Sequence, residues 1–369
     1  MTSASHIDTL VLGGGVVGMS IAYGLARAGD AVRVLDGGDN DFRAARGNFG
    51  LIWVQGKGLN KPAYARWTME SSARWPTLAQ QLVALTGTNV ELSQTGGLYM
   101  CMDEKELADR VAQLESLKKL LGTPYPYEVL DARQVRELEP RVGPAVVGAV
   151  LGLLDGHVSP LRLLRALVQG FEACGGELVT GIQAQRIEYR AGKFLVHSAG
   201  TTHVADKLIL TAGLGNRELA PQVGLRAPVK PVRGQILVSE RMQPFLRHPT
   251  HYVRQTAEGV VQIGDSKEEV GLDDATTMDE LARIARRAER CFPVLSKVNV
   301  VRSWGALRVM SPDGYPIYQA SSDCPGAFVV TCHSGITLAP MHAGPLVDWI
   351  RGGPEPADIQ GFKAERFHV

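Results

Sequence analysis

The sequence has few cysteines and no metal-ligand pattern. Five cysteines are scattered along 369 residues, and no two of them form a CxxC pair. An odd number of dispersed thiols argues against a disulfide framework and against a structural zinc site. We therefore expect reduced, buried thiols in a cytoplasmic protein that holds no metal.

An excess of one charge and long apolar runs are also absent. Lys and Arg together number 39 and Asp and Glu 38, so no overall charge favours nucleic acid or an acidic membrane. No apolar run approaches the ~20 residues that span a bilayer, and the first residues lack the basic start of a signal peptide. The composition predicts a soluble protein long enough for two ordinary domains.

What the sequence does contain is a glycine turn between a short apolar run and a helical pattern. The run over 7–12 is typical of a buried parallel strand, and Gly13, Gly15 and Gly18 follow it. In such a motif the first glycine permits a tight turn, the second lets a pyrophosphate approach the backbone, and the third lets helix and strand pack closely. The amides of Val16 and Val17, at the start of the helix, would face the phosphates.

An acidic residue completes the motif. Asp36 ends the next predicted strand, 18 positions after Gly18. A carboxylate about 20 residues past the glycines binds ribose hydroxyls, and it disfavours the 2′-phosphate of NADP. The motif alone does not separate FAD from NAD, and a glycine-rich connection that binds nothing is the structural alternative.

The remaining pattern mixes helices with two kinds of strand. Helices are predicted by apolar spacing and capping over 66–85, 104–121, from 160 onward, and over 279–291. A buried strand is expected over 207–213, antiparallel strands within 229–264, and a strand, a turn and a helix over 326–350. The predicted class is α/β, with a Rossmann-like domain and an α+β second domain.

Five segments resemble, in order along nearly the whole chain, the D-amino acid oxidase family of flavoproteins, which includes glycine oxidase and sarcosine oxidase. They are VLGGGVVGMSIAYGLARAGDAVRVLD, DGHVSPLRLLRAL, KLILTAGLGNRELA, SWGALRVMSPDGYPIYQ and VVTCHSGITLAP. The segment RGNFGLIWVQGKG (46–58), with TCHSGITLAP, looks closer to the flavoprotein subunits of opine oxidases, hydrogen cyanide synthase and hydroxyproline or proline dehydrogenases.

This resemblance implies a two-domain architecture. An FAD-binding domain would be built from 1–85, 150–225 and 305–369. An antiparallel-sheet substrate domain, from 86–149 and 226–304, would lie over the flavin.

The resemblance also assigns cofactor contacts by position in the family motifs. Asp36 would bind the adenosine ribose and Val179 the adenine side. Other small, polar or apolar positions would line the dinucleotide and the flavin ring: Arg43, Ala44, Arg46, Gly47, Asn48, Phe49, Gly50, Ala212, Gly213, Ser334, Gly335, Ile336, Thr337 and Leu338. No cysteine clearly occupies the family's attachment position, so non-covalent FAD is expected.

Substrate contacts follow from the same motifs. Arg308 matches the family arginine that grips a carboxylate with its fork of donors, although a surface arginine at a strand end is the alternative. Tyr252 matches a tyrosine that faces the substrate, or is an amphipathic tyrosine of the sheet. His333 would contact flavin or substrate, or be structural. Gln55 and Lys57 would reach a second substrate carboxylate, or be solvated loop residues.

The function implied is FAD-dependent oxidation of a carboxylated amine, such as an amino acid, an opine or an imino acid. A hydride would pass from the carbon bearing the amine to flavin N5, leaving an imine. One alternative is a flavoprotein subunit that passes electrons to a partner chain rather than to oxygen. Another is a non-catalytic FAD-binding assembly subunit. A homo-oligomer or a partner subunit is compatible with either.

Overall fold

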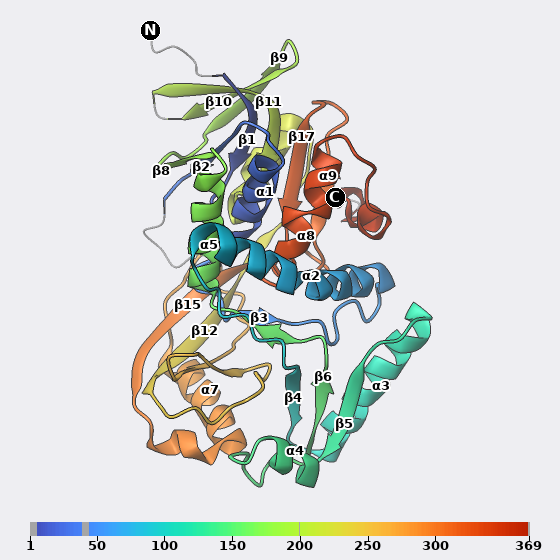
Figure 1. Ribbon diagram of the computed structural model, residues 1–369, viewed down its shortest axis with the longest axis vertical. Coiled ribbons are helices and arrows are strands. Elements are labelled where there is room, and N and C mark those ends of the chain that lie inside the picture. The colour runs from blue at the N-terminus through green and yellow to red at the C-terminus, as the bar shows by residue number, and fades with distance from the viewer. Residues whose placement is uncertain (1–5, 39–43, 199, 368–369) are drawn as a thin grey trace.

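The largest sheet of the protein joins strands from three distant parts of the chain (Figure 1). The computed structural model describes residues 6–38, 44–198 and 200–367. The sheet has the order β16-β17-β11-β1-β2-β8. These strands are β1 (His6–Leu12), β2 (Val32–Asp36), β8 (Glu177–Thr180), β11 (Thr201–Leu210), β16 (Ile317–Ala320) and β17 (Ala327–Thr331).

All pairings on this path are parallel except the one between β16 and β17. The central strand β1 is almost fully buried in its second half, as expected of a parallel strand covered on both faces. A hairpin of β9 (Arg186–Arg190) and β10 (Lys193–Ser198) extends the sheet along the first half of β11. The parallel α/β class predicted from the sequence is confirmed.

Helices from the start, middle and end of the chain cover one side of this sheet in a shared apolar core. They are α1 (Val16–Arg27), α2 (Pro62–Thr86), α5 (Pro160–Ala173), α8 (Ala339–Ala343) and α9 (Pro345–Ile350). Gly24 shows how closely two of them approach, because a Cβ there would lie 2.4 Å from the carbonyl oxygen of Ala343. The helix expected near the C-terminus is broken at Gly344, where Pro345 has no amide hydrogen to continue the ladder.

The lower part of Figure 1 holds two antiparallel sheets. The first has the order β13-β14-β12-β15 and the second β4-β6-β5. Their strands are β12 (Lys230–Arg241), β13 (Val253–Gln255), β14 (Val260–Ile263), β15 (Val300–Met310), β4 (Gly97–Cys101), β5 (Tyr127–Asp131) and β6 (Gly148–Gly152). Helices α3 (Glu104–Leu121), α4 (Ala132–Leu138) and α7 (Met278–Cys291) accompany them.

One apolar core runs through both small sheets and α7, and a backbone bridge between Leu98 and Thr250 links them. The predicted domain limits at 150 and 305 fall inside strands, namely β6 and β15. The division of the chain into two domains stays a prediction. No described helix is long and apolar enough to span a membrane. The remaining elements are β3 (Leu51–Ile52), β7 (Gly156–His157), α6 (Asn216–Leu219) and short 3-10 turns at 213–215, 220–223, 293–297, 357–362 and 364–367.

Candidate active site

The glycine turn sits at the carboxyl end of β1, where two of its glycines are required by packing. Gly13 has φ +110°, and a Cβ there would lie 2.5 Å from the Thr211 carbonyl oxygen. A Cβ on Gly18 would lie 2.0 Å from the Gly13 oxygen. A Cβ on Gly15, in contrast, would meet nothing closer than Ala45 Cβ at 3.7 Å. Gly15 therefore leaves the backbone open to a ligand, as a pyrophosphate requires.

The start of α1 and the end of β2 meet at this turn. No side chain caps α1 and its first turn holds no acidic residue, so the free amides of that turn are available to a phosphate. Asp36 accepts hydrogen bonds from the amides of Gly14 (2.7 Å) and Gly38 (3.0 Å), which hold its carboxylate beside the turn. The residues present fit the pyrophosphate and ribose of FAD.

The loop of residues 44–50 joins this region to the sheet of β12 and β15. Asn48 Oδ1 accepts from the Gly50 amide (2.7 Å), and the Gly47 oxygen accepts from Trp304 Nε1 (3.3 Å). A Cβ on Gly47 would lie 2.5 Å from Ala306 Cβ, so the loop runs directly against β15. Ala44, Arg46 and Phe49 lie in the same loop, whereas Arg43 lies outside the described residues.

Val179, Ala212 and Gly213 lie at the same end of the large sheet as the glycine turn. Val179, in β8, pairs with Leu35 of β2. Ala212 and Gly213 follow β11, where the Ala212 amide donates to Asn216 Oδ1 (2.9 Å) and a 3-10 turn begins. The structure therefore collects these predicted cofactor contacts from three separate stretches of chain.

The tail loop between β17 and α8 lies against the start of α1. A Cβ on Gly335 would be 3.1 Å from Val17 Cγ2. Thr337 anchors the loop to the segment after β3, because its Oγ1 accepts from the Trp53 amide (3.1 Å). The Thr337 oxygen accepts in turn from Ser71 Oγ (2.6 Å) of α2. Ile336 and Leu338 are buried in the core beside it. The tail loop is thus fixed next to the glycine turn.

Three predicted site residues meet at this loop. Lys57 Nζ donates to Ser334 Oγ (2.9 Å), and Ser334 Oγ lies 3.2 Å from His333 Nδ1. Burial, followed by the charge of Lys267, lowers the pKa of Lys57 to about 8. Lys57 and His333 nevertheless keep part of their surface accessible.

Positive charge converges on His333. The charge of Lys57 is the largest cause that holds the pKa of His333 well below its usual value, followed by burial and the charges of Arg308 and Lys267. His333 is therefore a neutral imidazole among cations. Such a place favours an anionic ligand, because a carboxylate would offset the repulsion between the three basic groups.

Arg308 lies on β15 with its guanidinium across β12. Its Nη2 donates to Asp265 Oδ2 (2.7 Å) and its Nη1 to the Ser266 oxygen (2.7 Å). Gly234 makes room for it, since a Cβ there would lie 2.5 Å from Arg308 Nη2. Arg308 is thus a held, partly exposed arginine with further donors available to a carboxylate, rather than a loose surface side chain.

The structure places Tyr252 away from this cluster. Its hydroxyl lies 2.7 Å from Cys291 Sγ of α7, inside the apolar core that the two antiparallel sheets share with α7. Its neighbour His251 stacks on the ring of Tyr99, with ring centres 4.1 Å apart. Among the described residues His251 Nδ1 is buried without a partner. Burial, followed by the charges of Arg287 and Arg110, holds the pKa of His251 well below its usual value.

Gln55 is buried with its side-chain amide already engaged. Its Nε2 donates to the Gly97 oxygen (2.8 Å), and its Oε1 accepts from Arg110 (3.2 Å). These contacts suit a residue that shapes the loop before Lys57. Of the predicted substrate contacts, the structure thus brings Lys57, His333 and Arg308 into one electrostatic environment, and gives Gln55 and Tyr252 structural partners.

Sequence reasoning missed Asp155, Asp265 and Lys267. Asp155 Oδ1 accepts from the amides of Val54 (2.5 Å) and Gln55 (3.1 Å), and burial raises its pKa to about 7. It therefore holds the turn that carries Lys57. Asp155 opens the DGHVSP segment, which was a usable signal, whereas the other two residues stand in no motif.

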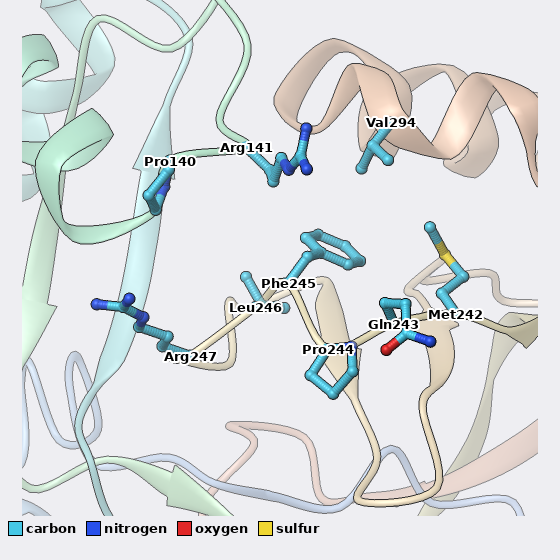
Figure 2. Close-up of a pocket in the computed structure, with 9 residues that line it drawn as sticks. All are labelled: Pro140, Arg141, Met242, Gln243, Pro244, Phe245, Leu246, Arg247 and Val294. Atoms are coloured by element: carbon cyan, nitrogen blue, oxygen red, sulfur yellow. The ribbon is translucent and has the colours of Figure 1, made fainter.

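A separate surface hollow lies far from this cluster. Its volume is about 440 Å³. Six apolar side chains, two arginines and a glutamine line it, as Figure 2 shows: Pro140, Arg141, Met242, Gln243, Pro244, Phe245, Leu246, Arg247 and Val294. It adjoins the end of α4, at the opposite end of the molecule from α1 in Figure 1. This hollow is not the cofactor site.

Comparison with known proteins identifies the class. Residues 8–349 match the model of the FAD dependent oxidoreductase family, and the chain belongs to that family. The predicted family, the enzyme class and the cofactor FAD are thereby confirmed.

Particular relatives cover nearly the whole chain. It is 43% identical over 365 residues to an opine oxidase subunit of Agrobacterium tumefaciens, covering 99% of this chain and 98% of that protein. It is 30% identical over 409 residues to the HcnC subunit of hydrogen cyanide synthase from Pseudomonas aeruginosa, covering 98% and 96%. The crystal structure of glycine oxidase from Geobacillus kaustophilus superposes with a TM-score of 0.90 at 24% identity, covering 97% and 98%, which shows the shared fold.

Proposed function

We propose that the protein oxidises a carboxylated amine beside the tail loop, where the charges of Lys57, Arg308 and Lys267 act on His333. That convergence of positive charge beside the tail loop is the observation that supports a carboxylated ligand. Bound FAD supplies the acceptor for a hydride from the carbon that bears the amine, which leaves an imine. The chain's own residues bind the carboxylate, orient the C–H bond and set the protonation of the amine.

Arg308 is the proposed ligand of the carboxylate next to the reacting carbon. Asp265 and Ser266 fix its guanidinium on one side, so the fork is oriented before a substrate binds. A bidentate contact through the remaining donors would hold the substrate against rotation. Orientation of this kind is worth several kcal/mol of the reaction barrier.

A second carboxylate is proposed to bind near exposed Lys267. Its charge lowers the pKa of Lys57 and of His333, so it adds to the positive charge beside the tail loop. The likeness to a protein named as a subunit of opine oxidase supports a secondary amine with a carboxylate on each arm.

The flavin is proposed to be held without a covalent bond. Cys332, next to the tail loop, is the nearest candidate for attachment, and burial raises the pKa of its thiol to about 12. A thiol in that state is not a thiolate at neutral pH, so it is a poor nucleophile. Acid precipitation of the purified protein should leave the flavin in the supernatant; yellow colour retained in the pellet contradicts this proposal.

An alternative is a dehydrogenase subunit that passes electrons to a partner chain. Three relatives at 30% identity or more carry the word subunit in their names, which favours this reading over an independent oxidase. Lys57 and His333 would have the same roles in an oxidase and in a dehydrogenase subunit, because both oxidise the amine in the same way.

Anaerobic flavin bleaching tests the proposal. The protein, reconstituted with FAD, is mixed with D-amino acids, N-methyl amino acids, opines and cyclic imino acids, and the visible absorbance of the flavin is followed. We expect dicarboxylated secondary amines to bleach it. Re-admitted air then separates the two readings: hydrogen peroxide favours an oxidase, and dye reduction without peroxide a dehydrogenase. A flavin that no amine bleaches refutes the proposal and favours a non-catalytic assembly subunit.

A further inference from the structure

Lys57 is held in place from its backbone and from its side-chain end. Its amide donates to the Val54 oxygen (2.9 Å), and the amides of Val54 and Gln55 donate to Asp155. At the other end Nζ donates to Ser334 Oγ. A lysine normally moves freely on four rotatable bonds, so these contacts fix a charge-bearing nitrogen at one point beside the tail loop.

The hydrogen bonds beyond Nζ can be assigned a direction, starting from the lysine. His333 is neutral, so one ring nitrogen accepts and the other donates. Because Ser334 Oγ accepts from Lys57 Nζ, its hydroxyl proton is free to be donated to His333 Nδ1, 3.2 Å away, and we assign Nδ1 as the acceptor. Ser334 then gives its only proton to His333 and presents lone pairs to Lys57. Neutral Lys57 consequently donates one N–H to Ser334 and keeps its own lone pair for a proton from elsewhere.

The charged and titratable groups around Lys57 come from several elements. Lys267 and Arg308 oppose its positive charge, whereas the carboxylate of Asp155 favours it. Burial is larger than any of these, and together they bring the pKa of Lys57 to about 8. The lysine is therefore neutral in an appreciable fraction of molecules near neutral pH.

We propose that Lys57 is the base that removes the proton from the substrate's ammonium nitrogen, with Ser334 and His333 as positioning residues. The inference rests on the proposed function. The N–H bond of the ammonium breaks, its electron pair stays on nitrogen, and the proton binds Lys57 Nζ. That lone pair forms the C=N bond as the hydride leaves the carbon for FAD. The lysine afterwards returns its proton to water.

A role as a ligand for a second carboxylate is the competing assignment for Lys57. Arginine separates the two, because it binds carboxylates well and stays protonated throughout the accessible pH range. Lys57→Arg therefore keeps the charge and removes the base. Lys57→Met removes both.

The test is the rate constant of anaerobic flavin reduction against pH, at saturating opine-type substrate. The wild type should show an ascending limb with a midpoint near pH 8. Lys57→Arg and Lys57→Met should both lose this limb, fall by about 10²-fold at pH 7 and recover where the substrate's own amine loses its proton. Ser334→Ala should move the midpoint below that of the wild type, because Oγ is an acceptor that stabilises the ammonium form of Lys57.

A wild type that bleaches while Lys57→Arg keeps the limb near pH 8 overturns the inference and leaves the proposed function standing. A wild type that no amine bleaches refutes the proposed function, and the inference falls with it.

A second readout needs no flavin. Trace labelling of the apoprotein with acetic anhydride, read by mass spectrometry across pH, should show Lys57 reacting with a midpoint near pH 8, with exposed Lys61 as the internal reference for reagent activity. A Lys57 midpoint near ~10.4, that of an ordinary lysine, also overturns the assignment.

Discussion

Replacement of Arg308 tests the carboxylate site in the most detail. In the structure its guanidinium is paired with Asp265 (2.7 Å) and bonded to the Ser266 oxygen (2.7 Å). Arg308→Ala removes the substrate's partner and also leaves Asp265 without its counter-charge. Removing one member of a buried charged pair, here the arginine that would hold the substrate carboxylate, costs about 2–5 kcal/mol. At 1.36 kcal/mol per factor of ten, kcat/KM should fall by about 30-fold to several thousand-fold.

The assay is steady-state dye reduction with an opine-type substrate, at matched flavin content. Arg241→Ala is the control, because Arg241 is an exposed arginine at the end of β12 in the same sheet. Arg308→Lys should fall between the wild type and Arg308→Ala, since it keeps the charge and loses the fork. A folded, flavin-loaded Arg308→Ala protein with near-normal kcat/KM would refute the reasoning.

Three further predictions concern stability and cofactor binding. Burial raises the pKa of Asp155 to about 7, so its protonated form stabilises the fold and this stabilisation is lost as pH rises toward 7. In urea unfolding between about pH 5 and pH 8, the free energy of unfolding of the wild-type apoprotein should fall by roughly 3 kcal/mol more than that of Asp155→Asn. Gly15→Ala should weaken FAD binding and leave the stability of the apoprotein unchanged. Gly18→Ala should destabilise the apoprotein by about 1–3 kcal/mol or more, because a Cβ at Gly18, unlike one at Gly15, collides with backbone atoms. Equal stability losses in the two variants would contradict this prediction. Tyr252→Phe should cost about 0.5–1.5 kcal/mol by removing the contact with Cys291, and a large rise in KM would instead return Tyr252 to the substrate site.

Much of the fold was predictable because the local spacing of apolar residues matches the buried faces of the observed strands and helices. The run over 7–12 and the helix after it were recognisable from apolar spacing alone, and α3 and α7 fall within one residue of their expected limits. The hairpin of β9 and β10 was missed because its strands are short, polar on one face and stabilised by pairing with β11.

The site was predictable only where motifs carry it. Lys57, His333 and Arg308 stood in segments that resemble the family, and the structure places them in one basic environment. Asp265 and Lys267 belong to no motif, because their role depends on how the segment after β14 returns to β15. Pairing of this kind is decided by tertiary packing, which local sequence does not encode.

The central claim is that a carboxylated amine reduces the FAD at the basic site around His333. Its most direct measurement is anaerobic bleaching by an N-carboxyalkyl amino acid, compared with the same compound as its dimethyl ester. The ester keeps the amine and the C–H bond and removes both negative charges. We predict that the free acid bleaches the flavin and that the ester does not. Equal bleaching by both compounds, or bleaching by the ester alone, would contradict the account.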